Sequence, residues 1–183
     1  MINGAERGSS AFATQAAELA ALRRVQRTIG KPPAVRVARA MSLFGEHSAG
    51  WAALGLLGAA LDRSRRREWL TATAGVVTAH AASIAVKRVV RRPRPDDPEV
   101  QVLVGTPSRL SFPSSHAAST TAAAVLYGGL VGTRATATVV PPMLLSRLVL
   151  GVHYPSDVLA GSALGALVGG GVLGWIRKRR ATR

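Results

Sequence analysis

The sequence predicts an all-α fold, an integral membrane helical bundle of five to six membrane segments with an N-terminal amphipathic helix. Hydrophobic residues make up 48% of the 183 residues, and the mean hydropathy is +0.20, which is high for a soluble protein. Aromatic residues are only 4%, so the apolar content is mostly Ala, Val and Leu beside 19 Gly. Small residues of this kind let membrane helices approach one another closely, and arginine runs separate the apolar segments.

The net charge and the missing cysteines limit the classes of function. Lys and Arg number 24 against 9 Asp and Glu, which gives a formal charge of +15. Such a charge suits nucleic acid, anionic lipid, or a phosphate site in a protein that follows the positive-inside rule. The basic residues flank hydrophobic segments instead of forming a soluble basic face, which argues against nucleic acid as a partner. Without cysteine, disulfides and thiolate metal sites are excluded.

Residues 1–33 are predicted to form an N-terminal arm. We expect residues 1–10 to be disordered and residues 11–29 to form an amphipathic helix, because apolar side chains recur there at helical spacing. The pattern allows a helix that lies in the membrane interface or one that is docked on the bundle. The arm lacks the continuous apolar core of a secretory signal peptide.

Residues 34–183 are predicted to form one membrane-embedded domain with five apolar segments. The segments cover residues 49–62, 69–90, 116–133, 135–152 and 157–176. A membrane helix needs about 20 residues, so either the first segment continues into residues 42–48 or this membrane segment is partly covered by protein. Pro141 and Pro142 are expected to kink the fourth segment.

Three polar residues in or beside these segments are predicted to have structural roles in preference to roles in a site. His80 lies in the middle of the second segment, and we favour a buried histidine bonded to a neighbouring helix over a place on the floor of a polar cavity. Glu46 and His47 precede the first segment, and we interpret them as interfacial polar groups in preference to substrate contacts.

The longest polar connection covers residues 91–115 and is rich in Pro and Arg. Long loops without regular structure often carry function. Asp96, Asp97 and Glu99 raise the question of a divalent metal, but Arg and Pro surround them, so a solvated lid is favoured. We predict neither a metal site nor a cofactor.

The stretch LLSRLVLGVHYPSDVLA, residues 144–160, carries the strongest indication of chemistry. Arg147, His153 and Asp157 lie there between two apolar segments, and ionisable groups near a bilayer core are costly enough to suggest a function. A histidine can attack phosphorus when a carboxylate holds its other ring nitrogen. An arginine offers a planar fork to phosphate oxygens. The simpler interpretation is a loop in which Ser156 or Asp157 caps the next helix.

Two further clusters carry matching chemistry. In the segment KRVVRRPRP, Lys87 and Arg94 can direct two cations at one anion. In the segment FPSSH, a turn opens an apolar helix whose first N–H groups and dipole can hold a phosphate. Ser114 is also a plausible N-cap there, and His116 could protonate a leaving alcohol. In an up-and-down bundle all three clusters meet at one membrane face.

The three motifs K-x6-R-P, P-S-x-H and S-R-x5-H-x3-D resemble the three-part signature of the type 2 phosphatidic acid phosphatase superfamily. The matching residues are Lys87, Arg94 and Pro95, then Pro113, Ser114 and His116, then Ser146, Arg147, His153 and Asp157. Three spaced motifs in this order are highly specific. Ser115 departs from the pattern because the family usually has Gly there, which keeps the backbone N–H but tightens the pocket.

The resemblance implies a metal-independent phosphatase that needs no cofactor. His153 would be the nucleophile and form a phosphohistidine, Asp157 would orient and stabilise it, and His116 would protonate the leaving oxygen. Water would then release phosphate. The phosphate oxygens would be bound by Lys87, Arg94, Ser114, Ser115 and Arg147.

A narrower resemblance concerns the substrate. The short length and the stretches FGEH, HAAS, GTPSRLSFPSSHA and VHYPSDV are similar to superfamily members that act on decaprenylphosphoryl-5-phosphoribose in cell-wall arabinan precursor synthesis. This implies a lipid-linked phosphate substrate. The alternatives are a generic lipid phosphatase (for phosphatidate, phosphatidylglycerophosphate or a polyprenyl pyrophosphate), a vanadate-binding haloperoxidase, which the apolar spans disfavour, and a non-catalytic membrane scaffold.

The charge distribution predicts a multi-pass protein of the cell membrane with its site on the extracytoplasmic side. The basic runs at residues 63–67 and 177–183 would lie on the face opposite the site. The positive-inside rule places that face in the cytoplasm. The basic residues of the arm conflict with this orientation if the first segment spans once.

Overall fold

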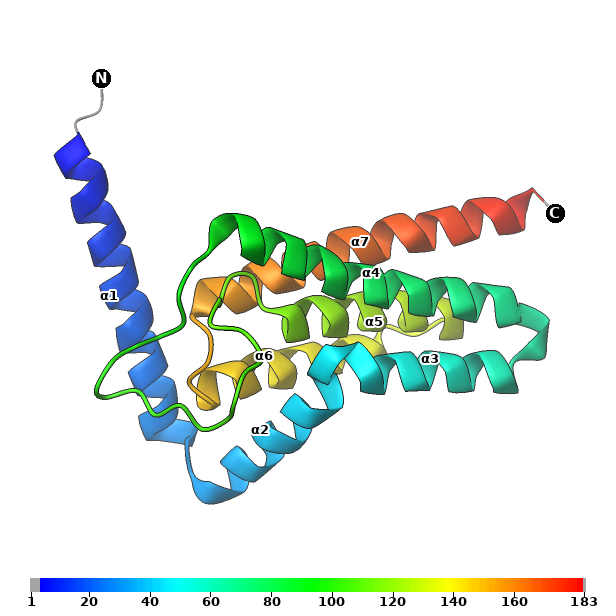
Figure 1. Ribbon diagram of the computed structural model, residues 1–183. Coiled ribbons are helices and arrows are strands. Elements are labelled where there is room, and N and C mark those ends of the chain that lie inside the picture. The colour runs from blue at the N-terminus through cyan, green and yellow to red at the C-terminus, as the bar shows by residue number, and fades with distance from the viewer. Residues whose placement is uncertain (1–3, 183) are drawn as a thin grey trace.

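A computed structural model describes the backbone of residues 4–182 and the side chains of residues 13–182. Its helices are α1 (Gly4–Ile29), α2 (Pro32–Gly45), α3 (Ala49–Leu61), α4 (Arg66–Val90), α5 (Ser115–Val131), α6 (Val140–Val149) and α7 (Pro155–Ala181). Short 3₁₀ turns cover Glu46–Ser48, Arg63–Arg65 and Ala135–Val139. No strand forms in the described part of the chain, so the all-α prediction is confirmed. Figure 1 shows α3, α4, α5 and α7 running alongside one another, with α1 across one end.

Helix α5 packs mainly against α4 and α7, and it is buried on nearly every side. Its Ala, Ser and Thr side chains are short, which lets the neighbouring helices approach closely. On α7, Gly161, Gly165 and Gly169 repeat every four residues and lie on one helical face. A Cβ atom at Gly165 would overlap the carbonyl oxygen of Ala118 in α5. This close contact fixes the first turn of α5 against the first turns of α7.

Large apolar side chains remain exposed along the outer helices. Leu57 of α3 is 52% exposed, Leu70 of α4 is 42% exposed and Leu167 of α7 is 75% exposed. Two helical stretches, Arg63–Val90 and Pro155–Ala181, are long and apolar enough to cross a membrane. The other helices of the bundle are shorter than the roughly 20 residues that a full span requires. The described chain therefore offers two candidate spans where the sequence suggested five to six segments.

The chain between α2 and α3 corrects one expectation. A continuous helix from residue 42 into the first apolar segment is wrong, because the 3₁₀ turn Glu46–Ser48 interrupts it. His47 and Ser48 have φ angles of 49° and 59°. Left-handed backbone at non-glycine residues costs about 1–2 kcal/mol per residue, so surrounding contacts must hold this break in place.

Two further local expectations are wrong. Pro141 and Pro142 lie in the first turn of α6, where a missing N–H is tolerated and the fixed φ angle suits the helix. They therefore begin a helix instead of kinking one. Helix α1 begins at Gly4, so the disorder expected for residues 4–10 is not observed. The same expectation for residues 1–3 lies outside the described residues.

Helix α1 is docked on the bundle end through its C-terminal half. Leu22 is fully buried, and Gln26 exchanges two hydrogen bonds with the backbone of Gln101, at 2.7 and 3.0 Å. Ion pairs join Arg23 to Asp97 and Arg27 to Glu99. Two of the three acidic residues in the connection are thus paired with α1, while Asp96 and Glu99 remain exposed to solvent as expected.

Candidate active site

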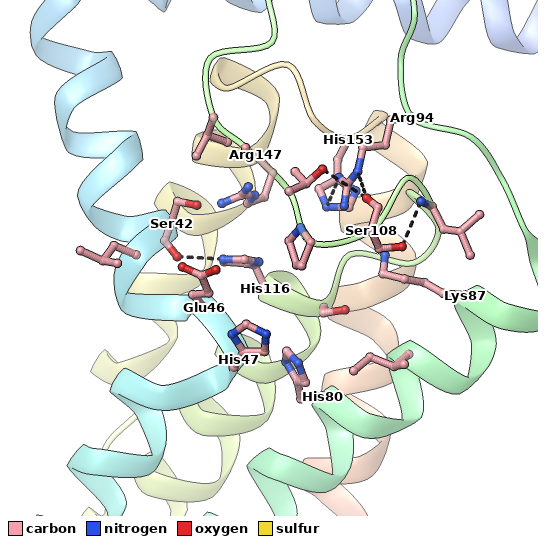
Figure 2. Close-up of a pocket in the computed structure, with 18 of the residues that line it drawn as sticks. Ser42, Glu46, His47, His80, Lys87, Arg94, Ser108, His116, Arg147 and His153 are labelled. Atoms are coloured by element: carbon pink, nitrogen blue, oxygen red, sulfur yellow. Dashed lines mark hydrogen bonds between the residues drawn. The ribbon is translucent and has the colours of Figure 1, made fainter.

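The three sequence clusters converge at the end of the bundle near α1 and the connection between α4 and α5 (Figures 1 and 2). They surround a cavity of about 410 Å³. Six of the eight predicted site residues line it, namely Lys87, Arg94, Ser115, His116, Arg147 and His153. The other two, Ser114 and Asp157, are fully buried behind its wall.

His153 lies in the turn between α6 and α7, with one ring nitrogen toward a carboxylate and the other toward a guanidinium. Its Nδ1 is 3.4 Å from Oδ2 of Asp157, and its Nε2 is 3.4 Å from Nη1 of Arg94. The same Oδ2 accepts the N–H of Tyr154 at 2.8 Å, which caps α7. Asp157 therefore serves both as the expected helix cap and as the partner of His153. A carboxylate acceptor favours the proton on Nδ1 and leaves the Nε2 lone pair free.

Lys87 and Arg94 are held in place by backbone carbonyl groups. The Lys87 ammonium donates to two carbonyl oxygens, at 2.8 and 2.6 Å. Arg94 donates to the carbonyl oxygens of Ser108 and Val152, at 2.8 and 2.6 Å. Neutral acceptors fix these side chains without cancelling their charge, so the positive potential remains available to an anion.

Arg147 is a buried cation with unused donors. Its side chain is 2% exposed, and its Nε and Nη1 atoms have no hydrogen-bond partner among the described residues. Burying an unpaired charged group costs several kcal/mol, so such groups normally have a partner. A guanidinium presents its N–H groups in a fork that matches two phosphate oxygens. The unused donors therefore make Arg147 a candidate for binding an oxyanion.

The first turn of α5 supplies polar groups to a second wall of the cavity. Ser114 is the N-cap, as predicted: its hydroxyl accepts the Ala117 N–H at 3.4 Å, while its own N–H donates to the Asp157 carbonyl at 2.9 Å. Ser115 lines the cavity and its hydroxyl is bonded to that of Ser83 at 2.7 Å. The first N–H groups of a helix have no partner within it and favour an anion.

His116 stands on the same turn. Its Nε2 is 2.9 Å from the carbonyl oxygen of Ser42 in α2. A carbonyl oxygen can only accept, so this nitrogen carries the proton. His116 is thus held in the cavity by Ser42, and a second proton, on its other ring nitrogen, would be the one that it can donate to a ligand.

Sequence reasoning missed two residues that hold Asp157. Arg92 donates to Oδ1 of Asp157 at 3.0 Å and pairs with Glu18 of α1. Glu18 also accepts the N–H of Ser156 at 2.9 Å. Arg92 is one of several arginines in its segment, and Glu18 lies 74 residues away from it. No local pattern distinguishes either residue, so only the tertiary structure identifies them.

Glu46, His47 and His80 line the same cavity (Figure 2). The ring centroids of His47 and His80 are 6.3 Å apart. The Nδ1 atom of His80 is buried without a partner in the described part of the chain, so it does not make the expected bond to a neighbouring helix. Their place in the cavity differs from the structural interpretations that the sequence favoured.

Burial and neighbouring cations control the protonation of His153. Burial lowers the pKa of His153 well below its usual value, and the charges of Arg94, Arg147 and Lys87 lower it further. Burial also lowers the pKa of Arg94 to about 10, partly opposed by Asp157. His153 is therefore neutral and Arg94 charged near neutral pH, which is the combination needed for an imidazole to attack a bound anion.

We expect His153 to stay neutral through pH 6. Its pKa is lower in the folded than in the unfolded chain, so protonation favours unfolding and stability falls as the pH drops below about 6.5. The ¹⁵N imidazole resonances of the folded protein, assigned with a His153→Gln variant, should keep the neutral pattern for this ring. The denatured protein should titrate near pH 6.5. Titration of folded His153 at or above that value would contradict the expectation.

Metal ligation has no candidate among the described side chains, because no three His, Asp or Glu groups lie together as a metal site. The arrangement itself combines a neutral imidazole backed by a carboxylate, three cations, and a second imidazole that lines the cavity. These groups can bind an oxyanion, attack it and protonate a departing oxygen.

Comparison with known proteins agrees with this chemistry. Residues 68–181 match the family model described as the PAP2 superfamily. A protein from Mycolicibacterium smegmatis named decaprenylphosphoryl-5-phosphoribose phosphatase is 61% identical over 132 residues, which cover 72% of this chain and 73% of that protein. A Mycobacterium tuberculosis protein of the same name is 57% identical over 141 residues, covering 77% of this chain and 80% of that protein.

A solved structure shares the fold. The crystal structure of a transmembrane PAP2 type phosphatidylglycerolphosphate phosphatase from Bacillus subtilis superposes with a TM-score of 0.76 at 24% sequence identity. The match covers 91% of this chain and 87% of the Bacillus chain. The helical arrangement in Figure 1 is therefore found in an experimentally determined structure.

Proposed function

This chain belongs to the PAP2 superfamily and is a phosphatase, and we propose that it removes the 5-phosphate from decaprenylphosphoryl-5-phosphoribose through a phosphohistidine intermediate. The names of the two mycobacterial relatives support this substrate. The observation that carries the chemistry is Arg147, whose buried Nε and Nη1 donors lack partners among the described residues. A phosphate monoester supplies the oxygens that these donors need.

Phosphate binding is assigned to three cations and one helix end. Arg147 holds two oxygens in its fork, while Lys87 and Arg94 add positive charge from positions fixed by carbonyl groups. The first turn of α5 contributes the N–H of Ser115, and Ser114 holds that turn in place from behind. Stabilising the charge on the transferring phosphoryl oxygens is the main task of a phosphoryl-transfer site.

The reaction proceeds in two displacements. Nε2 of His153 attacks phosphorus and the bond from phosphorus to the leaving oxygen breaks. His116 acts in its cationic form, with a proton on each ring nitrogen; it gives one of them to the leaving oxygen and becomes neutral. Asp157 stabilises the cationic ring of the phosphohistidine through Nδ1. Water, deprotonated by the now neutral acceptor nitrogen of His116, then cleaves the N–P bond, releases phosphate and restores both histidines.

We place the bundle across the cell membrane, with α3 to α7 as its five membrane segments and α1 as an arm. The two candidate spans and the exposed leucines support this placement. The cavity lies where α4 ends and where α5 and α7 begin. Figure 1 shows the C-terminal end of α7 at the opposite end of the bundle. Under the positive-inside rule the tail is cytoplasmic and the site extracytoplasmic.

The test is phosphate release by the full chain in detergent with excess EDTA. We expect polyprenyl-phosphoryl-5-phosphoribose to be hydrolysed with a kcat/KM at least about tenfold above that for phosphatidate, phosphatidylglycerophosphate or a polyprenyl pyrophosphate. EDTA should leave the rate unchanged, because the proposed mechanism uses no metal. Faster release from another lipid would refute the substrate assignment. Loss of activity in EDTA would refute the mechanism.

A further inference from the structure

The phosphatase mechanism leaves one side of the cavity unused. Glu46, His47 and His80, called the polar wall below, all line the cavity but have no part in binding or transferring phosphate. Nδ1 of His80 is buried and lacks a partner among the described residues. A buried polar atom without a partner is costly, so a bound molecule that offered the His80 ring a hydrogen bond would be favoured.

The position of the polar wall matches the position of the leaving group. In an in-line displacement the leaving oxygen departs on the side of phosphorus opposite the nucleophile, here opposite His153 and beside His116. A Cβ atom at Gly45 would lie 2.7 Å from Cδ2 of His116, and Glu46 is the next residue. In Figure 2, His116 lies between the Arg147–His153 side of the cavity and the labelled polar wall.

The backbone fixes this wall in an uncommon conformation. His47 and Ser48 both have positive φ angles, 49° and 59°. Strained backbone at non-glycine residues persists where surrounding contacts enforce it, and it is concentrated at functional sites. The break between α2 and α3 directs Glu46 and His47 into the cavity, where an uninterrupted helix would present a different face.

We propose that the polar wall binds the hydroxyl groups of the leaving group, so that the site takes the phosphate ester of a polyol such as a sugar ring. A carboxylate and two imidazoles can accept and donate to neighbouring hydroxyls, while Leu43 and Ile84 in the same cavity can contact the apolar face of a ring. The inference rests on the proposed function, in which the leaving group is a ribose. It adds the residues that select that sugar.

Selectivity for leaving groups that carry hydroxyls follows from the cost of leaving polar side chains of the cavity without hydrogen-bond partners. A leaving group without hydroxyls, such as diacylglycerol, would occupy the cavity and leave Glu46 and His80 without partners. Sites built to bind a hydroxyl discriminate strongly against analogues that lack it, because their polar groups are then buried unpaired. The polar wall therefore determines specificity, whereas the cations and His153 act on any phosphate monoester.

Two matched probes test the proposal on the full chain in detergent. Methyl ribofuranoside 5-phosphate carries the ring hydroxyls, and tetrahydrofurfuryl phosphate has the same ring ether without them. Both leave as primary alcohols and need the same help from His116. We expect wild-type kcat/KM to favour the sugar phosphate by at least about tenfold. Glu46→Gln and His80→Phe should each lower it about 10- to 100-fold for the sugar phosphate and by less than about threefold for the other probe.

The control variant is Glu68→Gln, which removes a carboxylate that pairs with Arg180, outside the cavity. It should leave both probes unchanged. Equal losses for both probes in Glu46→Gln and His80→Phe would overturn the proposal in favour of a structural role. A wild-type protein without preference for the sugar phosphate would overturn it as well, even if one variant failed to fold. A wrong proposed function would be detected separately, because another lipid would then release phosphate faster than polyprenyl-phosphoryl-5-phosphoribose.

Discussion

Replacing His153 by alanine is expected to lower kcat by about 10⁴-fold or more for every phosphate monoester. The variant loses the nitrogen that attacks phosphorus, while Arg147, Lys87 and Arg94 still bind the anion. KM should therefore change little. The measurement is phosphate release from the lipid substrate and from 4-nitrophenyl phosphate, with the melting temperature confirming that the variant folds.

His116→Ala provides the matched comparison. General acid catalysis contributes about 10²- to 10⁴-fold for an alcohol leaving group, but nitrophenolate leaves readily without a proton. His116→Ala should thus lose the lipid activity and keep most of the first-step rate with 4-nitrophenyl phosphate, measured as a burst. His153→Ala should lose both. A His153→Ala protein with more than about 1% of the wild-type kcat would show that His153 is not the nucleophile.

Replacing Gly165 by alanine is expected to destabilise the protein by about 1–3 kcal/mol, because the new Cβ would overlap the Ala118 carbonyl and force α5 and α7 apart. Alanine favours the helix over glycine by about 1 kcal/mol. Over most of the range above, this gain is smaller than the cost of the overlap. Activity should fall too, since α5 carries His116 and α7 carries Asp157. Thermal unfolding in detergent and kcat on the same preparations measure both effects.

Gly170→Ala is the control on the same helix. A Cβ at Gly170 would meet no atom within 4 Å, so only the propensity term remains and the melting temperature should stay the same or rise slightly. If both variants unfolded at the same temperature, the close contact between α5 and α7 would not limit stability.

Much of the fold was predictable from local patterns. The apolar segments at residues 116–133 and 157–176 closely match α5 and α7, since Pro, Gly and basic residues terminate them. The cluster at Arg147, His153 and Asp157 was predictable because ionisable side chains seldom occur between apolar segments without a use. Its three-part spacing further indicated the family to which the chain belongs.

The details that prepare the site for reaction were decided by the tertiary structure. Glu18 contacts Arg92, which lies 74 positions away in the sequence. Arg92 in turn contacts Asp157, 65 positions away. The break at Glu46–Ser48 turns two polar residues into the cavity. The sequence by itself determined which residue types carry the chemistry and which helices hold them, because hydrophobic periodicity and motif spacing are local. Only the packed structure decided which polar groups face one another, because distant backbone segments set those positions jointly.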